Sequence, residues 1–427
     1  MRAYLGLLVL FGVSPRPQYK DYWSTNIYIG NEGVKEVMSL KRFEKISQYF
    51  HVSDRESEPA RGSPQYDKLF KIRPVMNIVE QQSVELYKPR EHQAIDEGMI
   101  GYKGRESHVQ YMPAKPVKRG VKVFCRCDSE NGYLHQVEIY LGKANQNPSP
   151  RGVYFDVIDR LTKDIRGKYH RLFFDNLYTG IPLLLFLLEN QIYSTGTIRQ
   201  NRKFVPGNWP RGKMSRGEHK AMQDSKHPHL TLTAWQDTKT VRVCSTAISP
   251  ERVTHCIRRV RSVLQRVNQP LVLASYNKHY GGVDRFDQRR AKYRIGRFSR
   301  KSWKYLFHFY VNTAIINSWL LYCETSTRTK PSGRYEQLDY RTELLEELIG
   351  GFSTKQKNHR VKPPVFGPNA HPNVVNHENV HMNAHRVRLC IAHSRFKPNG
   401  RSKKQTAYGC RACGVHLCKE CHNLFHR

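Results

Sequence analysis

The sequence predicts an α/β fold in which helices are layered on a mixed β-sheet. Two observations support this prediction. Residues 93–199 alternate between strand-like and helix-like runs, whereas residues 1–92 and the residues after Gly282 have the periodicity of helices. Strands joined by short turns pair antiparallel, and strands joined by helices pair parallel, so the middle segment predicts a sheet of both kinds.

The first 92 residues are expected to be helical. Residues 1–13 are mostly apolar, and we interpret them as a core helix, because no small-residue cleavage site follows and the run is too short to cross a bilayer. The abrupt start suggests that the ordinary N-terminus of the fold, or an acidic leader, is missing. An apolar stripe within residues 41–50 and a segment from 71 to 87 predict two further helices.

Alternating apolar residues and turn signals predict strands over 93–99, 107–112, 121–127, 133–140 and 192–199, and a buried strand that ends before Asp175. Helices are expected over 153–165 and 180–190. This order fits the ribonuclease-H-like plan, in which acidic residues meet at strand ends. Cys125 and Cys127 share one face of their strand, and we interpret them as core residues.

Residues 200–270 interrupt this order. Residues 202–226 are basic and rich in Gly and Pro, and two later runs resemble paired strands, so the segment predicts a β-rich insertion. Helix is expected to resume at Gly282, and residues 304–322 predict one long, largely buried helix. Apart from a short helix at 344–348, residues 331–383 are polar and predict a linker.

Three aspartates in similar surroundings are the candidate catalytic residues. Asp175 follows an apolar strand, Asp96 follows Ala94-Ile95, and Asp284 follows a Gly-Gly-Val sequence. A single aspartate is more often a solvated strand end or a helix cap, but three in matching contexts favour a metal site. Because carboxylates suit Mg²⁺, and a pair of Mg²⁺ ions supports phosphodiester cleavage, we predict that all three bind two Mg²⁺ ions with DNA as substrate. The adjacent Glu97 is expected to point away.

The net charge predicts the partner. The 427 residues carry a formal charge of +35, spread along the chain, and the 24 tyrosines can stack on bases. A polyanion such as double-stranded DNA is therefore expected. An anionic membrane surface is the alternative, but no lipidation motif or long uncharged span supports it. The predicted DNA-binding residues follow Asp284 or lie close to Asp96 in the sequence: Lys103, Arg105, Arg289, Arg290, Lys292, Arg294, Arg297 and Lys301.

The cysteines predict a zinc-binding segment at the end of the chain. Five of the ten cysteines lie after residue 389, and clustered cysteines in a basic chain without a signal peptide favour metal in a reducing compartment. The thiolate pairs of Cys410-x2-Cys413 and Cys418-x2-Cys421 have the spacing of a tetrahedral zinc site, and His422 and His426 follow them.

Several short motifs occur in one order along the chain. They are Asp21-Tyr22-Trp23, Ile95-Asp96-Glu97, Tyr102-Lys103-Gly104-Arg105, Lys115-Pro116, Gly120-Val121-Lys122, Phe174-Asp175-Asn176, Gly196-Thr197, Tyr276-Asn277, Gly281-Gly282-Val283-Asp284, Asp287-Gln288 and the run from Asn312 to Ser318. In this order, and with the cysteine-rich tail, residues 4–426 resemble the piggyBac transposases and their domesticated derivatives.

The resemblance implies a domain organisation. A helical DNA-binding and dimerisation domain would come from residues 1–92 and 294–355. A ribonuclease-H-like catalytic domain would comprise residues 93–199 and 271–293, split by the insertion at 200–270. A linker at 356–384 would lead to the cysteine-rich zinc domain at 385–427.

The resemblance also implies roles for individual residues. The catalytic triad of the family maps onto Asp96, Asp175 and Asp284, and a further nearby aspartate maps onto Asp287. In the family, two zinc ions are held by interleaved ligands. Here one site would use Cys410 and Cys413 with His422 or His426. The other would use Cys390, Cys418 and Cys421, with His393 replacing a thiolate lost at Val387. His385 is the reserve donor, and a vacant second site is the alternative.

The leading functional hypothesis is a nuclear, homodimeric transposase that nicks and joins DNA at terminal repeats and TTAA targets, as the resemblance implies. The alternative is a domesticated DNA-binding protein without transposition activity. The aspartates favour the former, whereas the altered zinc pattern favours the latter. A structural chromatin protein is a third reading that rests on charge alone.

Overall fold

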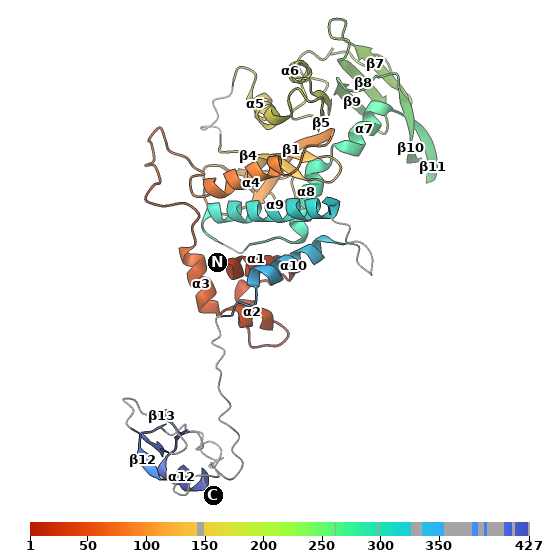
Figure 1. Ribbon diagram of the computed structural model, residues 1–427. Helices are drawn as coiled ribbons and strands as arrows, with labels where there is room; N and C mark the ends of the chain where they lie inside the picture. The colour runs from red at the N-terminus through yellow and green to blue at the C-terminus, as the bar shows by residue number, and fades with distance from the viewer. Residues whose placement is uncertain are drawn as a thin grey trace. The chain divides into compact units, whose positions relative to one another are not determined.

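The computed structural model describes the chain except residues 143–148, 261, 297–298, 326–334, 354–377, 383–387, 391–404, 412–414 and 426–427. The chain forms two compact units, Met1–Thr354 and Lys355–Arg427 (Figure 1). The first unit contains the sheet and most helices, and the second contains the cysteine-rich segment.

The N-terminal helices pack against helices from the end of the first unit. They are α1 (Arg2–Val13), α2 (Glu32–Val37), α3 (Leu40–Tyr49) and α4 (Arg73–Glu85). In α1, Leu7 and Leu8 are fully buried, which confirms the predicted core helix. Gly6 of α1 lies so close to α10 (Gln337–Ile349) that a Cβ atom there would be 2.9 Å from Ile349 Cγ1. This packing is what a two-segment helical domain requires, although its predicted boundaries stay predictions.

A mixed sheet of nine described strands forms the centre of this unit. Its order is β2-β3-β1-β5-β6-β9-β8-β7, with β4 also paired to β3. Strands β1, β5 and β6 are parallel, and the other pairs are antiparallel. The strands are β1 (His92–Gly101), β2 (Val109–Tyr111), β3 (Arg119–Asp128), β4 (Leu134–Ile139), β5 (Arg171–Phe174), β6 (Tyr193–Thr197), β7 (His219–Gln223), β8 (Thr231–Gln236) and β9 (Thr240–Ser245). The predicted α/β fold with a mixed sheet is confirmed.

Helices cover both faces of the sheet (Figure 1). One face packs against α8 (Gly282–Lys292) and α9 (Ser302–Thr325), and this core includes Cys125 and Cys127, which are fully buried as predicted. The other face packs against α5 (Val153–Leu161) and α6 (Ile181–Glu189). None of the helices in the described residues is long and apolar enough to cross a membrane.

The insertion extends the sheet. Strand β9 pairs antiparallel with β6, and β8 and β7 follow outward. Strands β10 (Val253–Val260) and β11 (Val263–Pro270) form a separate hairpin. The predicted helix start at Gly282 is confirmed by α8, but an additional helix, α7 (Leu271–His279), begins directly after this hairpin and was not predicted. Its apolar start, Leu271-Val272-Leu273, continues the strand-like pattern before it, so periodicity alone did not reveal the change.

In the second unit, β12 (Asn379–His381) lies within the predicted linker but pairs with β15 (Tyr408–Cys410). This unit therefore includes residues before the predicted boundary at 385. Three residues are too few to show alternation in the sequence.

Buried polar contacts explain part of the run from Asn312 to Ser318. Asn317 is buried in α9, where its Oδ1 accepts a hydrogen bond from the Leu134 backbone N–H (3.0 Å). Its Nδ2 donates to the Leu134 carbonyl (2.8 Å) and to Ser83 Oγ (3.1 Å). One amide therefore joins α9, β4 and α4. Asn312 similarly accepts a hydrogen bond from Arg341 of α10.

We expect Asn317→Ala to lower the free energy of unfolding by about 2–4 kcal/mol, because buried polar groups of Leu134 and Ser83 lose their partner. A urea titration followed by tryptophan fluorescence measures this change. Ser318→Ala is the matched control, since that hydroxyl bonds only the Ile315 carbonyl of its own helix, and it should change stability by less than about 0.5 kcal/mol. Equal midpoints for the two variants would contradict the assigned role of Asn317.

Candidate active site and metal centre

The register of two parallel strands places Asp96 beside Asp175. In the β1–β5 pair, Ile95 lies opposite Phe174, and each aspartate is the next residue. Strand β5 ends at Phe174 whereas β1 continues to Gly101, so Asp96 lies within β1 beside the C-terminal end of β5, where Asp175 follows. Asp175 Oδ1 also accepts a hydrogen bond from the Leu177 N–H (2.8 Å), which orients its side chain at the turn into α6.

Helix α8 lies along the same strand and brings Asp287 next to β1, with Asp284 one turn earlier in the helix. A Cβ atom at Gly282 would be 3.1 Å from Ala94 Cβ, and a Cβ atom at Gly98 would be 3.5 Å from Asp287 Oδ2. Alternate residues of a strand share a face, so the Asp96 side chain faces α8 between these two contacts. Asp284, in the first turn of α8, is exposed, and Asp287 pairs with Arg290 at 3.0 Å.

The four aspartates do not form a closed metal cage. Within the described residues, the group of three potential ligands whose atoms lie within 4.8 Å of one another is in the cysteine-rich unit, not at this edge. The predicted role of Asp96, Asp175, Asp284 and Asp287 as Mg²⁺ ligands therefore stays a prediction.

Glu97 belongs to this group of carboxylates, contrary to expectation. The Lys115 ammonium lies 3.9 Å from Asp96 Oδ2 and 3.8 Å from Glu97 Oε1, so one cation reaches both. Glu97 Oε2 also accepts a hydrogen bond from the Tyr178 hydroxyl (3.0 Å). The two side chains leave β1 on opposite faces, as alternation requires, but both are near the tip of the neighbouring strand, where Lys115 lies between them.

Burial shapes the charges at this edge. It raises the pKa of Asp96 to about 8, with the charge of Glu97 as the next cause, while Lys115 opposes the shift. Burial also raises the pKa of Asp175. Burial alone would raise the pKa of Glu97, but its hydrogen bond with Asp96 and the charges of Lys115 and Lys122 lower it. Clustered, partly desolvated carboxylate oxygens are a donor set that suits a hard divalent cation.

Two tyrosines complete the surroundings of the aspartates. Burial raises the pKa of Tyr276, on α7, to about 12, and the charges of Asp175 and Asp96 add to this shift. Its hydroxyl is hydrogen-bonded to Thr197 at the end of β6. Tyr178, which binds Glu97, is almost fully buried. Sequence reasoning did not assign either tyrosine to the site, although the motif Tyr276-Asn277 was a signal for the first.

The predicted basic residues do not all face the same way. Arg290 donates to Asp287 and to the Met99 carbonyl (3.0 Å), and Arg289 lies over the Trp319 ring at 5.3 Å. These two side chains therefore bind to the protein itself. Lys103, Lys292 and Arg294 are exposed, and Arg297 lies outside the described residues.

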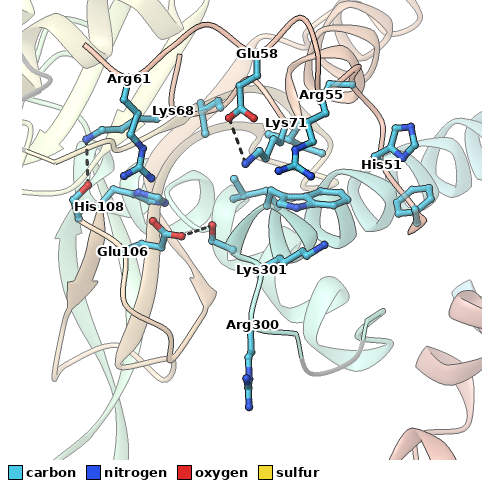
Figure 2. A pocket seen from close by; sticks show the side chains of 18 of the residues that line it. His51, Arg55, Glu58, Arg61, Lys68, Lys71, Glu106, His108, Arg300 and Lys301 are labelled. Atoms are coloured by element: carbon cyan, nitrogen blue, oxygen red, sulfur yellow. Dashed lines mark hydrogen bonds and ion pairs between the residues drawn. The ribbon is translucent and has the colours of Figure 1, made fainter. Parts of the chain in front are cut away.

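Arg105 and Lys301 line a groove of about 1600 Å³ (Figure 2). Its walls come from the segment after α3, from the residues around β2, and from the start of α9. Lysines and arginines outnumber acidic residues along it. Of the acidic residues, Glu58 forms an ion pair with Lys71 (3.3 Å), and Glu106 accepts a hydrogen bond from the Ser302 hydroxyl (3.0 Å). The basic residues are Arg55, Arg61, Lys68, Lys71, Arg105, Arg119, Arg300 and Lys301.

The second unit gathers three thiols. Cys390, Cys418 and Cys421 are buried, and their sulfur atoms lie within 4.8 Å of one another. Cys418 and Cys421 flank the start of α12 (Lys419–Phe425), and the Cys418 N–H donates to Cys390 Sγ (3.3 Å). Burial, together with the neighbouring thiols of Cys418 and Cys390, raises the pKa of the Cys421 thiol to about 12. The predicted grouping of these three cysteines is confirmed.

The remaining predicted zinc ligands are less completely described. Cys410 and His422 are buried in the same unit, and Cys410 belongs to the same packed cluster as the three thiols. His393, Cys413 and His426 lie outside the described residues. Three converging thiolates are a ligand set that zinc accepts, provided that a fourth donor completes the tetrahedron.

The fold and the site belong to a known class of protein. The family model described as Transposase IS4 matches residues 1–319, so the chain belongs to this transposase family.

Comparisons with individual proteins show the piggyBac type within this class. The chain is 28% identical over 335 residues to the human PiggyBac transposable element-derived protein 2, covering 75% of this chain and 55% of that protein. It is 25% identical over 437 residues to the human PiggyBac transposable element-derived protein 3, covering 100% of this chain and 69% of that protein. The chain thus spans about half the length of the former. The predicted family resemblance is confirmed.

A solved structure shows the same fold. The cryo-EM structure of a piggyBac transposase synaptic complex with hairpin DNA matches with a TM-score of 0.70 and 21% identity, covering 98% of this chain and 87% of that chain.

Gly196 allows the strands around Asp175 to approach closely. A Cβ atom at this position of β6 would lie 2.2 Å from Thr179 Oγ1 and 2.8 Å from the Phe174 carbonyl oxygen. We expect Gly196→Ala to destabilise the protein by about 1–3 kcal/mol through overpacking. Thermal unfolding measures this, and Gly207→Ala, where a Cβ atom would meet nothing within 4 Å, is the control. If both variants unfold at the same temperature, the close approach is not what requires glycine.

Proposed function

We propose that this chain is a metal-dependent DNA transposase that cleaves DNA strands at terminal repeats and transfers them to TTAA targets. The observation that carries the proposal is the pairing of Ile95 with Phe174, which sets Asp96 and Asp175 side by side at one sheet edge. Helix α8 then adds Asp284 and Asp287 from the face covered by that helix. The TTAA target is implied by family membership.

The sheet order supports a ribonuclease-H-like catalytic domain. Strands β4, β3, β1, β5 and β6 are neighbours in this order. The β4–β3 and β3–β1 pairs are antiparallel, and the β1–β5 and β5–β6 pairs are parallel. Asp175 follows the end of β5, and Asp96 lies within β1 directly after its last residue paired with β5. The catalytic segments at 93–199 and 271–293 are part of this proposal.

Asp96, Asp175 and Asp284 would hold the metal, with Asp287 close by. When bound, a pair of Mg²⁺ ions activates a water molecule and stabilises the leaving oxygen of a phosphodiester. The residues of the chain fix the carboxylates in place. The Leu177 N–H orients Asp175, Lys115 lies between Asp96 and Glu97, and Arg290 holds Asp287.

The partner in this proposal is double-stranded DNA, bound by a homodimer in the nucleus. The groove lined by Arg105 and Lys301 supports DNA binding, because its basic residues outnumber its acidic residues. Each lysine or arginine that neutralises a phosphate releases counterions, which gives salt-dependent affinity.

A DNA-binding protein without transposition activity is the second candidate. It is favoured by the names of the human relatives, which are described as transposable element-derived, and by the open arrangement of the aspartates. Such a protein would retain the basic surfaces and would not need the metal.

We expect Asp175→Asn to reduce DNA nicking at least about a hundredfold while leaving the fold intact, because the amide keeps the hydrogen bond from Leu177 but loses the charge. The assay incubates the protein with the terminal repeats that flank its own gene and Mg²⁺, and resolves nicked or hairpinned ends. Glu189→Gln, an exposed change of the same charge, is the control. Unchanged nicking by folded Asp175→Asn would end the metal assignment. DNA binding by the unmutated chain without any nicking would favour the second candidate.

We also propose that the cysteine-rich unit binds zinc. Cys390, Cys418 and Cys421 supply three ligands of one site, and His393 is the proposed fourth. Cys410, Cys413 and either His422 or His426 are proposed to form a second site.

We expect the full chain to hold two zinc ions and Cys421→Ser to lose one of them, because two thiolates no longer close the first tetrahedron. Atomic absorption after dialysis measures the zinc content per chain. His393→Ala should weaken the same ion, whereas Cys256→Ser, in the β10–β11 hairpin, should leave both in place. One zinc ion in the unmutated chain would show that the second site is vacant, and an unaltered content in Cys421→Ser would exclude the three-thiol site.

A further inference from the structure

The β10–β11 hairpin has one face that packs on the protein and one that is left in water. Directly opposed residues in an antiparallel pair point to the same side, and the register pairs Ile257 with Arg266 and Arg259 with Leu264. These four side chains therefore share one face. All four are exposed, with Ile257 at 66% and Leu264 at 65%. We call this the outer face, and it also includes His255 and Asn268.

The opposite, inner face fixes the hairpin to the sheet. Val267 packs with Trp235 and Val243 in a small core, and the Trp235 Nε1–H donates to the Asn268 carbonyl (2.7 Å). Arg258 binds Asp237 (2.9 Å) and lies over the Trp235 ring at 5.8 Å. The base of the hairpin is therefore held against β8 and β9 through Val267 and Arg258, whereas Val263 and Gln265, nearer the turn, are exposed on the inner face as well.

The outer face has the charge of a polyanion-binding surface. Residues 252–270 include five arginines and no aspartate or glutamate. Arg258 forms an ion pair with Asp237, but in the described part of the chain no ion pair involves Arg259 or Arg266. Two guanidinium groups without internal partners stand beside two exposed aliphatic side chains.

The shape of the hairpin suits a DNA groove. Eight residues per strand give a ribbon about 26 Å long at about 3.3 Å per residue. The major groove, about 12 Å wide, admits a two-stranded β-ribbon. In Figure 1, β10 and β11 extend beside α7 at the end of the sheet formed by β7, β8 and β9.

We propose that the outer face of the β10–β11 hairpin is a DNA-binding surface, distinct from the basic residues of α8 and from the groove in Figure 2. Arg259 and Arg266 contact phosphates of double-stranded DNA, and Ile257 and Leu264 contact the apolar parts of sugars and bases. Exposed aliphatic side chains between phosphate-binding arginines match the apolar and charged parts of a groove wall. This proposal rests on the proposed function in DNA, and it adds the element that holds the duplex.

The test measures affinity of the full chain for a fluorescein-labelled, mixed-sequence DNA duplex over a series of NaCl concentrations. Each lost phosphate contact reduces the slope of log K against log[salt] by about 0.9, so Arg259→Ala/Arg266→Ala should reduce it by about 1.8. Lys163→Ala/Lys168→Ala removes the same charge beyond α5, far along the chain, and should leave the slope unchanged. Thermal unfolding should be the same for all proteins, because both arginines are exposed.

An unchanged slope for the arginine pair, with a folded protein, overturns the proposal. A second copy of this chain is the other occupant that the exposed aliphatic residues fit. If Ile257→Ser/Leu264→Ser dissociates an oligomer in sedimentation while the arginine pair keeps the original slope, the outer face is a protein interface instead. Failure of the unmutated chain to bind the duplex would refute the proposed function itself, whereas binding with an unaffected arginine pair would refute only this inference.

Discussion

The parallel hydrogen bonds between β1 and β5 are the constraint on which the candidate site depends. They set Ile95 opposite Phe174, and the next residue on each strand is an aspartate. Leu172 and Phe174 are fully buried against α5 and α6, so a slip of one residue would turn both out of their core. Burial of these side chains therefore fixes the register of β1 and β5, and the register fixes the distance between the carboxylates of Asp96 and Asp175. Helix α8 can approach this part of the sheet because residue 282 is a glycine, where a Cβ atom would lie 2.8 Å from the Asp128 carbonyl oxygen and 3.1 Å from Ala94 Cβ.

The large positive charge of the chain has two separate uses. Part of it balances charge within the protein. Lys115 lies between two carboxylates, Arg290 pairs with Asp287, and the fully buried Arg126 pairs with Asp164. The rest faces solvent, in the groove of Figure 2 and on the hairpin. A basic run in the sequence therefore does not map directly onto a DNA-binding surface, and α8 contains both kinds of residue.

Much of the architecture could be predicted from the sequence, because periodicity reports burial. The core helix α1, most strands of the sheet and the buried Cys125 and Cys127 follow from apolar patterns, whereas β7 (His219–Gln223) lies in a segment that was interpreted only as basic and rich in Gly and Pro. The thiol cluster could be predicted in part because Cys418 and Cys421 flank one helix start, whereas Cys390 is far away in sequence and needed the family resemblance. Lys115 reaches the carboxylates of Asp96 and Glu97 from a distant segment, and the charges of Asp175 and Asp96 act on Tyr276 of α7, which no local pattern reports. Alternation along β1 correctly placed Glu97 on the opposite face from Asp96, but it did not show that both carboxylates reach one lysine at the strand tip.

The insertion is part of the central sheet. Strand β6 pairs with β5 on one side and with β9 on the other, so the strand beside Asp175 is also the strand on which the insertion is built. From β9 the hydrogen-bonded ladder continues to β8, whose Trp235 holds the hairpin through the Asn268 carbonyl. Interiors packed as tightly as protein cores transmit displacement because they have few voids to absorb it. A duplex seated on the outer face of the hairpin would therefore be positioned relative to Asp175 by the paired strands β5, β6, β9 and β8 and by the Trp235 contacts that join β8 to the hairpin. The insertion at residues 200–270 thus extends the central sheet through β9, β8 and β7.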